Sequence, residues 1–476
     1  MRREDVYYQA MLARDHRFDG KFFVGVTTTG IYCRPICPAR PKRENVVFFK
    51  NHLEAERQGY RPCLRCRPES APRSPAWIGR SAVVRRAVKM LHQPGYFALN
   101  EDRFAAKFGV TARHLRRLFN DEIGKTPKRL SFENRLNLSR TLIVDTALPL
   151  TEIAFAAGFR SVRRFNGAFK DRFKKTPGEI RREPIRQGPG WTVSLSYRPP
   201  FDFRGLLASY RAHAVGRLEW FEDGRMHRAV EFGGELGTVS ISDDAGKSRL
   251  LVDIAFPSVS AIPEILTRVR AMFDLDSDPL VIANALEGEK PLARLLLKHE
   301  GVRLPSGWDP FEIAIGAILG QLVSVERGRA LTGDLIEMLG REVSVGGRTV
   351  KLFPAPAAIA GGALDGLKTT GMRKRSLSAF AGAVARGEIS LEPAQDVEEF
   401  VDKVTSLPGI GAWTANYMAL KALRHTDAFP STDLILARAL ERHSAGSIER
   451  TRPWRGYVAA LLWREHADQL TKRSKV

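Results

Sequence analysis

The sequence predicts a multidomain protein in which two mixed α+β regions alternate with two all-helical regions. The chain has 476 residues, which is too long for one hydrophobic core, and domains usually contain about 100 to 200 residues. Segments rich in Pro, Gly and Ser interrupt the chain near residues 70–77, 183–191 and 301–310. We therefore expect four domains, at residues 1–75, 78–184, 190–304 and 305–476.

The four parts differ in the pattern of their apolar residues. The first is loop-rich around its cysteines. The second has the three-and-four spacing of helices in AVVRRAVKML, DRFAAKFGV and HLRRLF. The third alternates as strands do in TVSLSYRPPF, MHRAVEFG, TVSISDD and RLLVDIAF, and IPEILTRVRAMFDL predicts a helix packed on that sheet. The fourth is rich in Ala and Leu and predicts helices interrupted at LPGIG and FPST.

The net charge of +22 is concentrated at the start of the chain. Residues 1–185 hold 38 Lys and Arg against 18 Asp and Glu, whereas residues 186–476 hold 37 against 35. Such a basic block favours binding to a polyanion, and nucleic acid is the commonest one in a cell. An anionic membrane surface is the alternative, but neither an amphipathic basic helix nor a lipid anchor is visible.

The cysteine content predicts a metal site rather than disulfide bonds. The start MRREDVYYQA lacks the apolar core of a signal peptide, and no stretch of about 18 uncharged apolar residues occurs, so we expect a cytoplasmic protein. Disulfides are disfavoured in that compartment. All four cysteines lie in the pattern Cys33-x3-Cys37-x25-Cys63-x2-Cys66, whose two short-spaced pairs suit one tetrahedral zinc ion. Four unrelated buried thiols, or a purely structural zinc, are the alternatives.

The residues around the cysteines indicate which reaction this site carries out. GVTTTGIYCRPICPARPKRENVVFF and GYRPCLRCRP resemble the amino-terminal domain of the Ada methyl-acceptor family, over about residues 1–70. The resemblance implies one zinc ion, both structural and thiolate-activating, and implies that Cys33 takes a methyl group from a methyl phosphotriester in DNA. Methylating one of four thiolates changes the charge of the metal cluster from −2 to −1, which weakens repulsion from DNA phosphates and predicts a switch.

A repeat of about fifty residues predicts two DNA-reading units. The two copies are GVTARHLRRLFNDEIGKTP and GFRSVRRFNGAFKDRFKKTP. Each copy predicts a helix, a Gly turn and a second, basic helix. A solvated charged face is the alternative for each basic helix. The paired motifs resemble the AraC family of transcription activators over roughly residues 78–183. This implies two helices in the major groove, RNA polymerase as a partner during activation, and groove or phosphate contacts from Arg116, Arg163 and Arg164.

The word LPGIGAWTA from Leu407 fits a helix-hairpin-helix turn, in which Gly409 and Gly411 let backbone N–H groups approach a DNA phosphate. An ordinary turn between helices is the alternative. Asp433 follows Gly411 by twenty-two residues, the spacing of the catalytic aspartate in helix-hairpin-helix glycosylases. A helix N-cap before LILARALERH is the alternative for this residue.

Four sequence motifs resemble the AlkA family of 3-methyladenine DNA glycosylases. In chain order they are DPFEIAIGAILGQLVSV, LPGIGAWTANYMAL, DAFPSTDLIL and RPWRGYVAALLW. The resemblance is weak from Trp191 through the β-rich part, for which it implies a TBP-like α+β domain, and strong from Asp309 onward. It implies that Asp433 is the catalytic carboxylate and that Trp413, Tyr417 and Trp463 form an aromatic pocket for the base. It also implies that Gln321, Leu322 and Thr414 contact the DNA, with Leu322 as the wedge that fills the gap left by the flipped nucleotide. Core packing is the alternative for these aromatics.

The chemistry implied is hydrolysis of the bond between a sugar and a damaged base. An N-alkylated purine is cationic and already a good leaving group, so a carboxylate that faces the developing sugar cation suffices. Trp413 stands where strand-nicking relatives have a lysine, which predicts a monofunctional enzyme. No cysteine follows Cys66, so we expect no iron–sulfur cluster. Thr432 departs from the aspartate that commonly precedes the catalytic one.

Together these observations predict a DNA-3-methyladenine glycosylase II that also accepts methyl groups on Cys33 and acts as a methylation-switched activator in an adaptive response to alkylation. Two alternatives are an AraC-type regulator with an inactive glycosylase domain, and a glycosylase whose front half only tethers it to DNA. The Ada family often carries a further acceptor domain, marked by a Pro-Cys-His-Arg motif, for alkyl groups on guanine oxygen. This motif does not occur in the sequence, so we expect no activity on O6-methylguanine. The target promoters, the preferred base, the oligomeric state and cooperation between the halves stay open.

Overall fold

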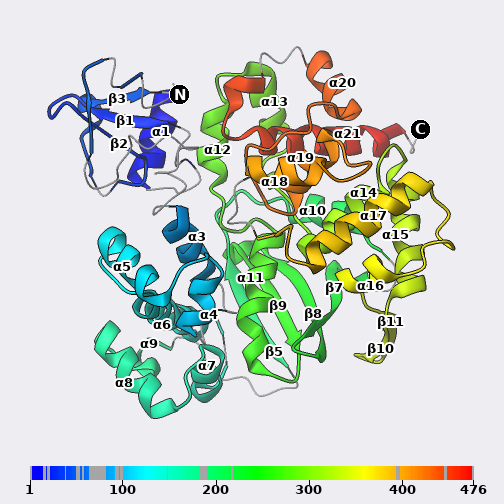
Figure 1. Cartoon of the computed structure of the whole chain (residues 1–476), viewed down its shortest axis with the longest axis horizontal. Coiled ribbons are helices and arrows are strands. Elements are labelled where there is room, and N and C mark those ends of the chain that lie inside the picture. The colour runs from blue at the N-terminus through cyan, green and yellow to red at the C-terminus, as the bar shows by residue number, and fades with distance from the viewer. Residues whose placement is uncertain are drawn as a thin grey trace.

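The computed structural model describes residues 3–473, apart from residues 14–17, 19–21, 38, 50–53, 56–57, 64–81, 92–95, 97–99, 147, 182–189, 216–217, 393–396 and 444–447. Cys66 therefore lies outside the described residues. Figure 1 shows the N-terminal sheet at the upper left, the helix-turn-helix pairs below it, a five-stranded sheet at the lower centre, and a helical region across the top and right. In the described part of the chain, no helix is long and apolar enough to cross a membrane.

The described part of the N-terminal region contains a small sheet and the helix α1. Its elements are α1 (Arg3–Leu12), β1 (Phe23–Val26), β2 (Ile31–Cys33), η2 (Arg43–Asn45), β3 (Val46–Phe49) and β4 (Arg61–Pro62). The strand order is β3-β1-β2-β4, with β1 antiparallel to both neighbours and β2 parallel to β4. Phe23, Tyr32, Phe49 and Ala55 form a buried cluster on this sheet.

The second region contains both predicted helix-turn-helix units. Its helices are α3 (Ala82–Leu91), α4 (Glu101–Ala106), α5 (Ala112–Ile123), α6 (Pro127–Asp145), α7 (Leu150–Ala156), α8 (Val162–Phe173) and α9 (Pro177–Ile180). Gly109 and Gly158 have φ of 66° and 75° at the two turns, a conformation that favours glycine. The repeated Lys-Thr-Pro word is explained by helix starts, because Thr126 and Thr176 cap α6 and α9 and a proline follows each at the first helical position.

The third region is the predicted α+β part. Its elements are β5 (Trp191–Ser196), α10 (Phe203–His213), β6 (Glu219–Glu222), β7 (Arg225–Phe232), β8 (Glu235–Asp244), η5 (Ala245–Lys247), β9 (Arg249–Ala255), η6 (Val259–Ala261) and α11 (Ile262–Met272). The sheet is antiparallel throughout, in the order β5-β9-β8-β7-β6. The strands and α11 coincide with the sequence prediction, whereas α10 and β6 were not predicted.

The described part of the fourth region is mainly helical and includes a β-hairpin. Its elements are α12 (Pro279–Leu286), α13 (Lys290–Lys298), α14 (Pro310–Leu319), α15 (Val325–Leu339), β10 (Glu342–Val345), β11 (Arg348–Lys351), α16 (Pro356–Gly361), α17 (Gly371–Ala385), α18 (Val397–Thr405), α19 (Ala412–Lys421), α20 (Leu434–Arg442), η7 (Ile448–Thr451) and α21 (Arg455–Arg473). Gly346 and Gly347 both have positive φ between β10 and β11, as a tight hairpin requires. The sequence prediction did not include this hairpin, although the Gly-Gly pair between two alternating segments is its usual signal.

The hydrophobic cores join regions that are distant in sequence. One core combines the N-terminal region with the helical region, and the rings of Phe18 and Trp454 meet edge-on with centroids 5.0 Å apart. A second core combines the second helix-turn-helix unit with the five-stranded sheet, which Thr146 and Val193 also link by an isolated β-bridge. The first helix-turn-helix unit has a core of its own. The chain therefore packs as coupled regions.

Candidate active site and nucleic-acid interface

Three of the four cysteines converge at one edge of the N-terminal sheet. Cys33 ends β2, Cys37 follows in the next turn, and Cys63 comes directly after β4. Because β2 and β4 run parallel, their carboxyl ends lie at the same end of the sheet. The Cys63 N–H donates to the carbonyl of Tyr32 at 3.0 Å. The three sulfur atoms lie within 4.8 Å of one another. Cys33 and Cys37 are buried and Cys63 is partly buried.

This sulfur arrangement fits one metal ion. Sulfurs at about 2.3 Å from a tetrahedral zinc are roughly 3.8 Å apart, close to the spacing found here. Buried thiolates this close repel one another, so the cluster of Cys33, Cys37 and Cys63 needs a cation to be stable as thiolates. The predicted ligand Cys66 falls outside the described residues, so the geometry of a fourth ligand stays a prediction.

Asp433 lies at the start of α20 and is held by N–H donors. Its Oδ1 accepts hydrogen bonds from the backbone N–H groups of Ile435 and Leu436, both at 3.0 Å, so Asp433 is the N-cap of α20. Its Oδ2 accepts from the indole Nε1 of Trp413 at 3.1 Å, and Trp463 Nε1 lies 3.5 Å from Oδ1. The capping interpretation is therefore correct, and it is compatible with the catalytic one, because capping uses Oδ1 and leaves the carboxylate half-buried.

The three aromatic residues predicted for the base pocket form one cluster beside Asp433. The rings of Trp413 and Tyr417 stack with centroids 5.3 Å apart, and Tyr417 and Trp463 follow at 5.9 Å. Burial and the charge of Asp433 raise the pKa of the Tyr417 hydroxyl to about 12. Tyr417 and Trp463 pack against the hydrophobic core, but all three residues are only partly buried and keep an exposed part. The cluster offers electron-rich faces next to a carboxylate.

The predicted hairpin and wedge lie next to each other. Gly409 has φ of 72°, and a Cβ there would lie 2.4 Å from Ser376 Oγ, so only glycine fits. Gly411 is the N-cap of α19, and a Cβ there would have no other atom within 4 Å. The Gln321 amide donates to Gly409 O at 3.1 Å and to Thr414 Oγ1 at 2.8 Å. Leu322 is fully exposed with φ of 53°.

Thr414 differs from the other residues predicted at the DNA. Its side chain is 2% exposed and accepts a hydrogen bond from Gln321. This buried contact joins the loop that carries Leu322 to the first turn of α19. The Thr414 side chain therefore positions Gln321, a role that sequence reasoning did not assign.

Two supporting groups were missed from the sequence. Arg373, near the start of α17, donates to the backbone carbonyl of Gln321, directly before Leu322. It is also bound to Thr369 Oγ1 at 2.6 Å, so its guanidinium holds the base of the exposed loop. No local sequence pattern indicates this contact, because the two residues lie 52 positions apart.

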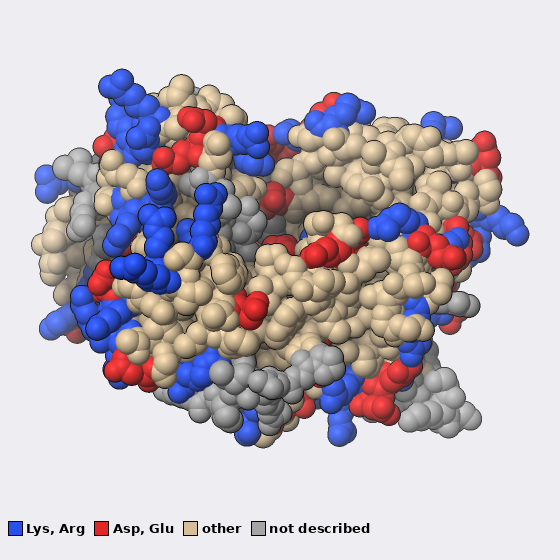
Figure 2. Space-filling view, turned by 90° about the horizontal axis from the view of Figure 1, so that it is seen from below, with Lys and Arg blue, Asp and Glu red and all other residues tan. Residues whose placement is uncertain are grey.

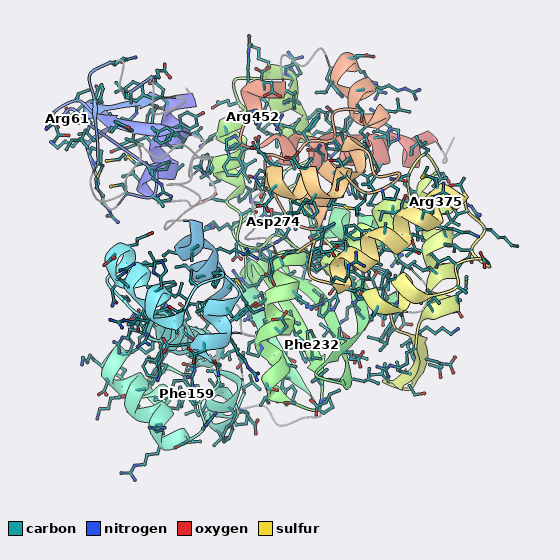
Figure 3. All side chains as sticks on the ribbon, viewed as in Figure 1. Arg61, Phe159, Phe232, Asp274, Arg375 and Arg452 are labelled. Carbon is teal, nitrogen blue, oxygen red and sulfur yellow. The ribbon has the colours of Figure 1, made fainter. Side chains whose placement is uncertain are left out.

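The second missed group fixes the loop that leads to Asp433. Asp427, 2% exposed, accepts from Arg452 at 2.7 Å and from Arg455 Nε at 3.0 Å. Arg452 is labelled in Figure 3, near the N-terminal end of α21. The N–H of Gly456 also donates to Thr426 O at 2.7 Å. The loop between α19 and α20 is therefore clamped to the start of α21, while Thr432 beside Asp433 is exposed.

The basic helices of both helix-turn-helix units face outward. Ser161 and Thr111 cap α8 and α5, and the predicted contact residues Arg116, Arg163 and Arg164 are all exposed. Figure 2 shows lysine and arginine side chains gathered at the left, with some acidic side chains among them, on the side where Figure 1 places α5 and α8. The exposed cations thus coincide with the predicted reading helices.

These features define a protein that joins a cysteine metal site, a helix-turn-helix pair and a helix-hairpin-helix glycosylase fold. Three family models match it, the metal binding domain of Ada at residues 6–69, a helix-turn-helix domain at 104–183 and the AlkA N-terminal domain at 192–309. A probable bifunctional transcriptional activator/DNA repair enzyme AlkA of Mycobacterium tuberculosis is 34% identical over 96% of this chain and 95% of its own. The chain therefore belongs to the family of bifunctional transcriptional activator/DNA repair enzymes of the AlkA type.

Two Escherichia coli proteins match separate parts of the chain. DNA-3-methyladenine glycosylase 2 is 30% identical over 57% of this chain and 96% of its own length. The bifunctional transcriptional activator/DNA repair enzyme Ada is 42% identical over 26% of this chain and 34% of its own length. The resemblances to Ada and AlkA stated from the sequence are confirmed.

Proposed function

We propose that this protein excises N-alkylated purines such as 3-methyladenine from double-stranded DNA as a monofunctional glycosylase. The observation that carries the proposal is the half-buried Asp433 carboxylate, hydrogen-bonded by the indole of Trp413 beside a stack of partly exposed aromatic rings. A flipped cationic base would fit against those rings, which favour a cation by about 0.5 to 2 kcal/mol per contact. Leu322 would fill the gap that the base leaves in the duplex.

The reaction follows from the position of the carboxylate. The bond between the sugar C1′ and the base nitrogen breaks, and both electrons go to the nitrogen, so an alkylated base leaves neutral. The sugar becomes cationic and is stabilised by Asp433, which the N–H donors of α20 and Trp413 hold in position. Water adds to C1′ and its proton passes to solvent. No lysine stands at the Trp413 position, so the product is an abasic site with an intact strand.

We infer that the N-terminal region accepts a methyl group from a methyl phosphotriester in DNA. Cys33, Cys37, Cys63 and Cys66 would hold one zinc ion, which keeps the thiols deprotonated at neutral pH. The Cys33 sulfur attacks the methyl carbon, a C–S bond forms, the C–O bond breaks, and the phosphate diester leaves as an anion. The thioether is not regenerated, so each molecule reacts once.

We infer that this methylation switches transcription. The loss of one negative charge at the sulfur cluster strengthens DNA binding by the neighbouring basic helices, where Arg116, Arg163 and Arg164 are exposed. RNA polymerase is the partner that an activator of this kind would recruit. The corresponding functional domains are residues 1–75, 78–184, 190–304 and 305–476. An AraC-type regulator with an inactive glycosylase domain is the alternative, which the assembled Asp433 site disfavours.

One experiment tests both reactions. Wild-type protein, Asp433→Asn and Cys33→Ala are incubated with methylated duplex DNA, and released bases and protein mass are measured. We expect Asp433→Asn to lose roughly a thousandfold in 3-methyladenine release and to keep a methyl adduct of about 14 mass units. Cys33→Ala should release the base normally and carry no adduct. Base release that is insensitive to Asp433→Asn would contradict the glycosylase assignment, and an adduct on Cys33→Ala would contradict the acceptor assignment.

A further inference from the structure

Met372 is an exposed apolar residue beside the helix-hairpin-helix turn. It is the second residue of α17, and it is 48% exposed. A Cβ on Gly409 would lie 2.9 Å from Met372 Cγ and 3.1 Å from its sulfur, so the side chain packs against the hairpin glycine. Ser376 Oγ lies 3.0 Å from Met372 O and 2.7 Å from Pro408 O, which joins the first turn of α17 to the same hairpin. Met372 is therefore packed on one side and exposed on the other.

One hydrogen bond links Met372 to the predicted wedge. Arg373 donates to the backbone carbonyl of Gln321. Met372 directly precedes the donor residue, and Leu322, which is fully exposed, directly follows the acceptor residue. Two exposed apolar side chains from different elements, α17 and the loop between α14 and α15, are thus brought near each other. Apolar side chains that stay exposed next to a proposed DNA site indicate a contact surface.

Arg373 itself is engaged within the protein. Its two terminal nitrogens donate to Gln321 O and to Thr369 Oγ1, the second at 2.6 Å, and the residue is partly buried. A guanidinium is well suited to read a base edge, but these contacts use this one to hold the loop. Met372 is the neighbouring group that remains exposed. Its thioether offers dispersion contacts without a strong hydrogen bond, so it can pack on a base of any identity.

Exposed cations accompany these apolar side chains. Arg327, near the start of α15, donates to Lys368 O at 2.8 Å, which joins α15 to the segment before α17. Arg375, labelled in Figure 3, has its Nη2 3.8 Å from the Met372 sulfur. The side chains of Arg327, Lys368 and Arg375 are all exposed. Positive charge around an apolar contact suits a nucleic-acid strand, in which each base is linked to phosphates.

A flipped nucleotide leaves its partner in the other strand without a base pair. Leu322 would fill the gap in the damaged strand, but the orphaned partner base still lacks a contact. We propose that Met372 packs on this orphaned base and thereby stabilises the extruded state, so that Leu322 supports the damaged strand and Met372 the undamaged one. The proposal rests on the proposed glycosylase function and adds the opposite strand as the partner of α17.

The test compares two duplexes that contain 7-methylguanine, one with cytosine opposite the damaged base and one with an abasic-site analogue there. Single-turnover excision is measured for the full-length wild type, Met372→Ala and Met372→Leu. We expect Met372→Ala to lower excision roughly fivefold opposite cytosine and to leave it unchanged opposite the abasic analogue, which has no base to contact. Met372→Leu should keep most of the wild-type rate on both duplexes, because it retains an apolar side chain of similar size.

Two further variants are the controls. Leu322→Ala should lose the same factor on both duplexes, because the gap in the damaged strand is present in each. Met338→Ala removes a methionine of α15 that is 38% exposed, and it should leave both rates unchanged. Circular dichroism and the melting temperature check that all variants fold.

The outcomes separate this proposal from the glycosylase function. A loss in Met372→Ala that is equal on both duplexes would assign Met372 to support of the hairpin and overturn the contact with the orphaned base. Wild-type rates of Met372→Ala on both duplexes would overturn it as well. If the wild type releases 7-methylguanine from neither duplex, the glycosylase function itself fails, and the role of Met372 fails with it.

Discussion

The two proposed reaction centres are both anionic, but the fold prepares the two anions in opposite ways. In the N-terminal region, the sulfur atoms of Cys33, Cys37 and Cys63 lie within 4.8 Å of one another, so as thiolates they repel one another. In the helical region, Asp433 is surrounded by neutral N–H donors from α20 and from two indoles. The sulfur cluster therefore depends on an added cation, whereas hydrogen bonds within the fold stabilise the carboxylate.

The difference suits what each centre does. A thiolate that is consumed once needs high nucleophilicity, which a metal-held sulfur retains at neutral pH. A carboxylate that acts in every turnover needs a fixed position, which a helix N-terminus and Trp413 supply. The two centres nevertheless share one hydrophobic core, in which Phe18 packs on Trp454. Because the two centres are proposed to catalyse separate reactions but share one core, a change at one centre can be tested for an effect on the reaction at the other.

Removal of the metal has the largest expected effect. A chelator applied to the full-length protein should abolish methyl transfer to Cys33, because the thiols become protonated and the link between the cysteines is lost. Excision of 3-methyladenine should change by less than about twofold, since Asp433 has its own donors. Adduct mass and base release are measured on the same sample, and added zinc is the control. A parallel loss of both activities would show that Asp433 depends on the metal through the shared core.

Replacing Trp413 by Phe tests whether indole N–H groups prepare the carboxylate. The variant keeps an aromatic face but loses the 3.1 Å hydrogen bond to Asp433, and a hydrogen bond to a charged group contributes about 1.5 to 3 kcal/mol. Single-turnover excision should therefore fall roughly 10- to 100-fold. Trp463→Phe is the matched control, with a smaller expected loss because its N–H lies 3.5 Å from Asp433. Equal losses in both variants would indicate that ring packing dominates.

Local spacing explains what could be predicted from the sequence. The turn glycines Gly109 and Gly158 and the strands β5, β7, β8 and β9 follow from patterns of residues a few positions apart, and the structure confirms them. The contacts of Arg373 with Gln321, Asp427 with Arg452 and Phe18 with Trp454 join distant segments. Such contacts depend on how whole elements pack, and helical periodicity does not contain that information. The double role of Asp433, as cap and as carboxylate beside the pocket, was visible only as two competing alternatives.

Leu322, the predicted wedge, gives the smallest expected effect. Its φ of 53° is unfavourable for a branched side chain by about 1 kcal/mol, and its side chain is fully exposed, so neither feature contributes to stability. Leu322→Ala should lower excision from duplex DNA roughly threefold but leave excision from alkylated single strands unchanged, because only a duplex leaves a gap to fill. Leu322→Gly should show the same rates and gain about 1 kcal/mol in the free energy of unfolding. Equal rate losses on both DNA forms would contradict the wedge role and point to a contact with the damaged nucleotide itself.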